Sequence, residues 1–124
     1  MKIILAIAGG GAAGALLRYW ISLGVHGLLG RDFPWGTITV NVLGSLLMGW
    51  LSFILLAREA APEWRGLLLI GGLGAFTTFS TYSLETLHLL EQGHIGKASL
   101  YILSSVALCL IAVWAGLWLG RHIH

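Results

Sequence analysis

Charged residues are scarce in this chain of 124 residues, where Asp, Glu, Lys and Arg together make up 10% of the sequence. A soluble globular domain carries about 25% charged residues, and the apolar share here is 57%, with a mean hydropathy of +0.88. The formal net charge of +2 comes from scattered basic residues, so nucleic-acid binding has no support. The composition excludes a soluble protein and favours a membrane domain.

Cysteine and acidic residues are also rare. Cys109 is the single cysteine, which excludes a disulfide within the chain and a thiolate metal cluster. No P-loop, HExxH or CxxC pattern occurs. The histidines fall at segment ends without ligand spacing, and we expect them to be interfacial: His26, His88, His94, His122 and His124. The sequence therefore offers no catalytic constellation, and we predict that the protein is not an enzyme.

Four apolar segments account for most of the chain. Charge-free runs cover residues 33–57, 66–84 and 98–120, and the first segment is interrupted only by Arg18. Each segment meets the requirement of about 20 apolar residues for a membrane-spanning helix. We predict an all-α membrane protein with a single transmembrane domain over residues 1–124 and spans near 3–29, 33–57, 64–90 and 97–121.

Signals for helix ends flank these spans. Asp32 lies near a cap position of the second span, with Pro34 in the first turn, where its missing N–H costs little. Pro62 has the same place in the third span, and residues 93–96 indicate the last turn.

The basic residues leave the membrane orientation open. Four spans place both termini on one side, and the basic residues of that side are Lys2, Arg58, Arg65 and Arg121. The other side has Arg31 and Lys97, plus Arg18 if it reaches that interface, so the positive-inside rule gives little preference. Either the chain inserts in both orientations, or a difference of one or two charges sets a single orientation.

Small residues recur at the spacing that lets membrane helices approach closely. Gly10 pairs with Gly14 and Ser45 with Gly49, and a third stripe contains Ala112, Gly116 and Gly120. Four short spans enclose little interior, so a pore needs a second subunit. A homo-oligomer is favoured, most simply a two-fold dimer.

The third span contains an unusual polar run, GGLGAFTTFSTYSLE, over residues 71–85. A helix that faces lipid gains nothing from so many glycines and hydroxyls. Non-helical backbone at membrane depth is tolerated only where it is buried in protein or lines a cavity. The run predicts a break in the middle of this span and a permeation or ion-binding site.

Asn41 needs a partner within the membrane. It shares one helix face with Thr37, Ser45 and Gly49, at four-residue spacing, and its unpaired N–H groups would cost several kcal/mol in hydrocarbon. An interhelical hydrogen bond is one explanation, and a donor that faces a permeating anion is the other.

Two further features are open to two interpretations each. In the last span, Tyr101, Ser105 and Cys109 also lie four apart; their hydroxyls either donate to an anion or bond back to the backbone. Arg18 either snorkels to the headgroups or forms an electropositive vestibule. Polar stripes on two helices and a break on a third together imply a narrow polar track.

These residues in their local sequences, Arg18 in GALLRYW, Asn41 in TVNVLGS and the FTTFSTYS of the third span, together resemble the dual-topology fluoride channel family of bacteria. The resemblance covers nearly the whole chain in the same order. It implies an antiparallel homodimer in the bacterial inner membrane, with two pores that are each built from both subunits. The implied activity is passive export of fluoride, which relieves fluoride toxicity.

The resemblance also implies roles for individual residues. Asn41 would contact fluoride, and Phe79 and Tyr82 would be the two aromatic positions that line the pore. Gly74 and Thr77 would hold a structural sodium ion (Na+) at the dimer interface through their backbone carbonyls. The remaining matches are the vestibule residue Arg18, the signature residues Thr78, Ser80 and Thr81, the acidic position Glu85, and the polar track of Tyr101, Ser105 and Cys109.

The chain departs from the family pattern at three places. Tyr82 replaces the more usual phenylalanine, Cys109 replaces a hydroxyl residue, and Ala75 with Phe76 stands where glycine is more usual. Two other functions compete with a channel. A small multidrug exporter would have an acidic residue in the first span, where this chain has Arg18; a structural subunit of a membrane complex would carry no ions.

Overall fold

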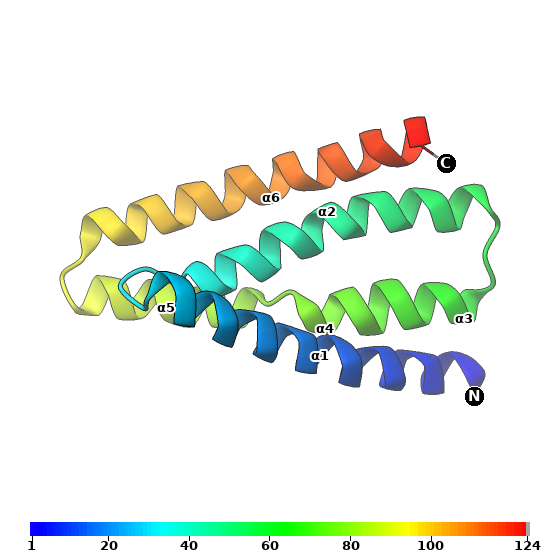
Figure 1. Cartoon of the computed structure of the whole chain (residues 1–124), viewed down its shortest axis with the longest axis horizontal. Coiled ribbons are helices and arrows are strands. Elements are labelled where there is room, and N and C mark those ends of the chain that lie inside the picture. The colour runs from blue at the N-terminus through cyan, green and yellow to red at the C-terminus, as the bar shows by residue number, and fades with distance from the viewer. Residues whose placement is uncertain (124) are drawn as a thin grey trace.

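The computed structural model describes residues 1–123 and consists of helices that run side by side, with both termini at the same end (Figure 1). Four helical segments are long and apolar enough to cross a membrane. The first is α1 (Lys2–Leu29), the second α2 (Trp35–Ala57) and the last α6 (Ile95–Ile123). The third is divided into α3 (Pro62–Arg65), η1 (Gly66–Leu73), α4 (Gly74–Phe76) and α5 (Phe79–Glu91). The predicted all-α class with a broken third span is confirmed.

Glycines bring the helix backbones together in two pairs. A Cβ atom at Gly49 would overlap the Val113 carbonyl of α6, and one at Gly116 would overlap the Leu46 carbonyl of α2. Gly10 and Gly14 of α1 lie in the same way against the backbone of η1. Small residues therefore set the helix pairs α2–α6 and α1–η1, as their spacing predicts.

The break in the third span lies at Thr77 and Thr78. The short α4 lies directly before the break, and η1 before it is π-helical, a rare form that is frequent at functional sites. Thr77 and Thr78 are extended, with φ/ψ of −86°/156° and −151°/116°, and α5 begins at the next residue. The Thr78 side chain caps α5 by accepting a hydrogen bond from the Thr81 N–H at 3.2 Å.

The start of α2 differs from the sequence-based prediction. Pro34 is the N-cap residue and has no side chain that can cap, so the prediction of a cap near Asp32 is wrong. The first N–H groups of a helix need acceptors, and His26 in the last turn of α1 provides one: its Nε2 accepts from the Gly36 N–H at 3.2 Å. His26 is thus a structural residue and not merely an interfacial one. His124 lies outside the described residues.

The other predicted helix ends agree with the structure. Pro62 is at the first position of α3. Gly93 has a φ of +82° in the turn between α5 and α6, a left-handed conformation that favours glycine. Near this turn, Lys97 donates from Nζ to the Asp32 carbonyl at 3.3 Å, which ties α6 to the α1–α2 connection.

Candidate functional site

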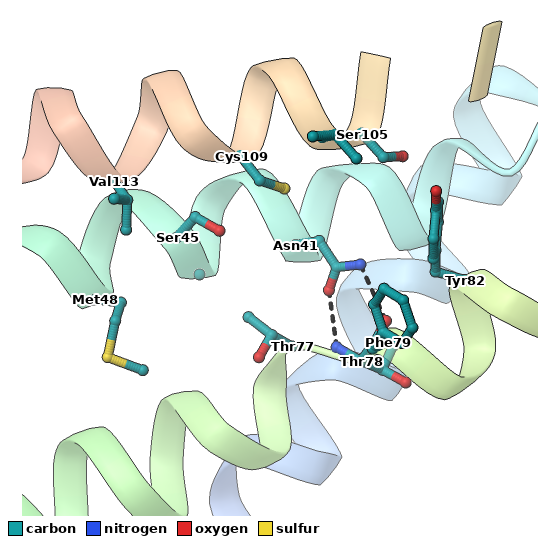
Figure 2. Close-up of a pocket in the computed structure, with 12 residues that line it drawn as sticks. Asn41, Ser45, Met48, Thr77, Thr78, Phe79, Tyr82, Ser105, Cys109 and Val113 are labelled. Carbon is teal, nitrogen blue, oxygen red and sulfur yellow. Dashed lines mark hydrogen bonds between the residues drawn. The ribbon is translucent and has the colours of Figure 1, made fainter. Parts of the chain in front are cut away.

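A cavity of about 300 Å³ lies between α2, the break and α6, and Figure 2 shows the side chains around it. Its polar lining residues are Asn41, Ser45, Thr77, Thr78, Ser105 and Cys109, with the hydroxyl of Tyr82. The other lining residues are apolar: Gly44, Met48, Phe79, Val106 and Val113. None of these residues carries a charge, so the cavity presents hydrogen-bond donors without a carboxylate to repel an anion.

The Asn41 amide is paired at both ends with the backbone of the break. Its Oδ1 accepts from the Thr78 N–H at 2.8 Å, and its Nδ2 donates to the Thr78 carbonyl at 3.0 Å, as the dashed lines in Figure 2 show. The interhelical hydrogen bond, one of the two explanations for Asn41, is therefore present. Nδ2 carries two hydrogens, and the second has no hydrogen-bond acceptor among the described residues.

Ser105 presents a buried hydroxyl without a partner. The residue is 6% exposed, and its Oγ makes no hydrogen bond within residues 1–123. A buried polar group without a partner costs about 1–3 kcal/mol, so this hydroxyl is free to donate to a ligand that reaches it. The neighbouring Ser104 is different, because its Oγ donates to the Tyr101 carbonyl at 3.3 Å.

Aromatic rings form a row from the edge of this cavity into the core. Phe79 is 78% exposed, and its ring centroid lies 5.3 Å from that of Tyr82. The Tyr82 ring is 5.1 Å from the Tyr101 ring, which in turn meets the Phe33 ring edge-on at 5.4 Å. Both Phe79 and Tyr82 line the cavity, and the edges of aromatic rings carry partial positive charge.

The structure does not bring every predicted pore residue to this cavity. Tyr101 is fully buried between other rings, and its hydroxyl donates to Glu85 Oε1 at 3.2 Å instead of lining the track. Ser80 is exposed at the start of α5, with its Oγ 3.3 Å from Thr78 Oγ1. Thr81 lines a second cavity on the other side of the break.

This second cavity, of about 330 Å³, is lined by charged groups from α1, α5 and the α1–α2 connection: Arg18, Glu85 and Arg31. The Arg18 side chain turns inward, and its Nε donates to the Ala75 carbonyl at 3.0 Å, next to the break. This contact argues against snorkelling to the headgroups, and the vestibule role of Arg18 stays a prediction. The contact also satisfies a carbonyl that the interrupted helix leaves without a partner.

Three carbonyls at the break remain available among the described residues, those of Gly74, Phe76 and Thr77. Within the described chain, no backbone N–H after the break donates to the carbonyl oxygen of Gly74 or Thr77. Oxygen atoms of this kind are suitable ligands for a hard cation. No group of His, Cys, Asp or Glu side chains in residues 1–123 is arranged to hold a metal ion.

Sequence reasoning missed four apolar residues of the cavity between α2, the break and α6, two of which, Val106 and Val113, lie on α6. Gly44 and Met48 line it together with Asn41 and Ser45. Their spacing from Asn41, at three and seven residues, places them on the same helix face. This spacing could have indicated Gly44 and Met48, but neither side chain offers the polar group by which a site residue is recognised in a sequence.

Comparison with known proteins places the chain in a family. The family model described as CrcB-like protein, Camphor Resistance (CrcB), matches residues 5–117. A protein named fluoride-specific ion channel FluC from Methylococcus capsulatus is 58% identical over 121 residues, which are 97% of this chain and 53% of that protein. The chain therefore spans about half the length of this relative.

Two other relatives match over nearly their full length. Proteins with the same name are 53% identical over 118 residues in Magnetococcus marinus and 50% identical over 124 residues in Geobacter sulfurreducens. The alignments cover 94% and 99% of this chain, and 96% and 100% of the relatives. The resemblance inferred from Arg18, Asn41 and the third span is thus confirmed: this multi-pass membrane protein belongs to the CrcB-like protein family.

Proposed function

We propose that the protein is a passive, fluoride-selective ion channel that exports fluoride across the bacterial cytoplasmic membrane and so relieves fluoride toxicity. The observation that carries this proposal is the cavity beside the break, where an amide hydrogen of Asn41 and the buried hydroxyl of Ser105 have no acceptor within residues 1–123. The relatives that match over their full length are named fluoride-specific ion channels, which supports the same function.

The donors suit the chemistry of fluoride. Fluoride is small and holds its water tightly, so a pore must replace that water with hydrogen-bond donors. Hydrogen bonds to a charged group contribute about 1.5–3 kcal/mol each, and the Asn41 amide, the Ser105 hydroxyl and the Cys109 thiol supply several along one wall. In the second cavity the two arginines, Arg18 and Arg31, outnumber the single carboxylate of Glu85, and a net positive charge there raises the local concentration of anions.

The competing functions fit less well. A proton-coupled exporter requires a carboxylate in the membrane, and α1 and α2 contain none. A structural subunit would fill its polar stripes with partner helices and would carry no ions, so fluoride efflux from liposomes that contain only this protein separates it from a channel.

We further propose that the channel is an antiparallel homodimer. Phe79 is 78% exposed although it lies on the candidate pore, so a second subunit is needed to close that side. The difference of one or two basic residues between the two membrane sides gives little preference for one orientation, which an antiparallel pair requires. Crosslinking at pairs of engineered cysteines in a C109S background tests this arrangement, and parallel pairs alone would contradict it.

The carbonyls of Gly74 and Thr77 are the proposed ligands of a structural sodium ion at the dimer interface. They accept no hydrogen bond from the described residues that follow the break, as an ion-binding carbonyl requires. When bound, sodium supplies positive charge beside the anion path. Gly74 and Thr77 contribute only main-chain oxygens, so side-chain changes there leave the ligand atoms in place.

Efflux from liposomes tests the function directly. Purified protein is reconstituted in liposomes loaded with potassium fluoride or potassium chloride, and valinomycin starts efflux that an ion-selective electrode follows. We expect rapid fluoride efflux and no chloride efflux, with protein-free liposomes as the control. Fluoride efflux no faster than in the control would reject the channel, and equal fluoride and chloride efflux would reject its selectivity.

A further inference from the structure

The amide of Asn41 can in principle take two orientations. Turned one way it offers N–H to the cavity, and turned by 180° it offers its oxygen, which repels an anion. Figure 2 shows Asn41 pointing from α2 toward Thr78, and Thr77 pointing from the break back toward α2. The contacts between these residues select one orientation of the amide.

We propose that the backbone of the break fixes the orientation of the Asn41 amide. Gly44 is the positioning residue, because it lets the break lie close enough to α2 for these hydrogen bonds. The Thr78 N–H needs an acceptor and its carbonyl needs a donor; Asn41 meets both at 2.8 and 3.0 Å. Turning the amide would place N–H against N–H and oxygen against oxygen. The pairing therefore leaves one N–H free for the anion and keeps the oxygen away from it. This inference rests on the proposed function, because it assigns the anion donor of that channel.

Gly44 controls how closely the break approaches α2. Both the N–H and the Oγ1 of Thr77 donate to the Leu73 carbonyl at 3.0 Å, which fixes the rotamer of Thr77. The methyl carbon Cγ2 of Thr77 then rests against Gly44, where a Cβ atom would overlap it. That Cβ would also lie 3.2 Å from Cδ2 of Phe76, which is 5% exposed.

A larger residue at 44 must therefore push Thr77 and Thr78 away from α2. The two hydrogen bonds to Asn41 lengthen, and the amide becomes free to turn. The expected consequence is a loss of both fluoride flux and discrimination against chloride, with the fold retained.

The sequence offers a direct spectroscopic test, because Asn41 is its only asparagine. Protein labelled with 15N-asparagine has a single asparagine side-chain NH2 group, whose two protons are recorded by NMR in detergent micelles. Without fluoride we expect two well-separated proton signals, one of them protected from exchange with D2O by its bond to Thr78. On addition of sodium fluoride we expect only the other proton to shift.

The outcomes separate the inference from the proposed function. Two equivalent or equally unprotected protons before fluoride is added would overturn the orienting role, whatever the channel conducts. If one proton is protected as expected but fluoride shifts neither signal, Asn41 is not an anion donor, and the proposed site is contradicted. A shift of both protons by fluoride would also overturn the inference.

Substitutions at the contact give a second test. Gly44→Ala should reduce fluoride flux on the order of 10- to 100-fold, the loss expected when a binding group is displaced by about 1 Å, and should remove the protected proton. Thr77→Ser deletes the methyl carbon and keeps the hydroxyl on Leu73, so it should restore the protected proton in the double variant. Thr77→Val keeps a methyl carbon in the same place and should not.

The loss of flux caused by Gly44→Ala is measured twice, once in the wild type and once in the T77S variant. If Gly44→Ala reduces flux to a similar extent in both, the clash with the methyl carbon of Thr77 is contradicted. Gly96→Ala is the matched glycine control, since a Cβ atom added at Gly96 would have nothing within 4 Å. We expect it to leave both flux and the Asn41 spectrum unchanged.

Discussion

Replacing Ser105 by alanine should stabilise the protein and impair the channel at the same time. The Ser105 hydroxyl is buried on the cavity wall and has no partner in residues 1–123. Alanine removes the hydroxyl and little volume, so the variant avoids the cost of burying an unpaired polar group, about 1–3 kcal/mol. In the absence of fluoride we therefore expect a gain of about 1 kcal/mol, or about 3–5 °C in Tm for a domain of this size.

The same substitution removes a donor from the anion path. A hydrogen bond to a charged group contributes about 1.5–3 kcal/mol, which corresponds to a flux about 10- to 100-fold lower if the bond forms at the rate-limiting position. Thermal unfolding in detergent without fluoride gives the stability, and liposome efflux gives the flux. The opposite signs distinguish a functional donor from a structural one, which alanine would weaken in both assays.

Ser104→Ala is the matched control. Its hydroxyl is one residue away but donates to the Tyr101 carbonyl at 3.3 Å and lies off the cavity. This variant should show no gain in Tm and no change in flux. A Ser105→Ala protein that is less stable than wild type, or that conducts equally well, would refute the reasoning.

Three further substitutions test other contacts. Asn41→Asp keeps the acceptor for the Thr78 N–H but loses the donor to its carbonyl and adds negative charge, so fluoride efflux should fall to the protein-free level; efflux near wild type would contradict the donor role. Gly36→Ala places a Cβ atom 2.8 Å from Cε1 of His26. The loss of the hydrogen bond from the N–H of residue 36 to His26 should lower the free energy of unfolding by about 1 kcal/mol. Unfolding in detergent measures this change, with Gly96→Ala as the control. Cys109→Ser should abolish inhibition of fluoride efflux by a methanethiosulfonate reagent, because this thiol lines the cavity; equal inhibition of the variant would place the reactive site elsewhere.

The helices were predictable because their signals are local. A run without charge indicates a span wherever it occurs, and the observed helices begin and end within two residues of the ranges expected for them. The break was predictable for a similar reason, since glycines and hydroxyls are tolerated at membrane depth only beside a cavity. The position of the break at Thr77 and Thr78, within a longer polar run, was not.

The partners of the polar residues were less predictable, because they lie far away in the sequence. Asn41 could be assigned a hydrogen bond but not its partner Thr78, which is 37 residues away. Tyr101 shares a stripe with Ser105, yet it is turned into the aromatic core and toward Glu85. Helical spacing shows which residues share a face, but it does not show which neighbour that face meets.

Composition, hydropathy and a few short motifs thus established a membrane protein of four spans and its family, and they predicted residues for a polar path. The pairing of Asn41 with the break, the close fit of Thr77 against Gly44 and the lack of a partner for Ser105 within the described chain emerged from the packed helices. The physical reason is the distance along the sequence between the residues that interact. Apolar length and helix propensity are properties of neighbouring residues, whereas the direction of a buried hydrogen bond depends on groups that folding alone brings together.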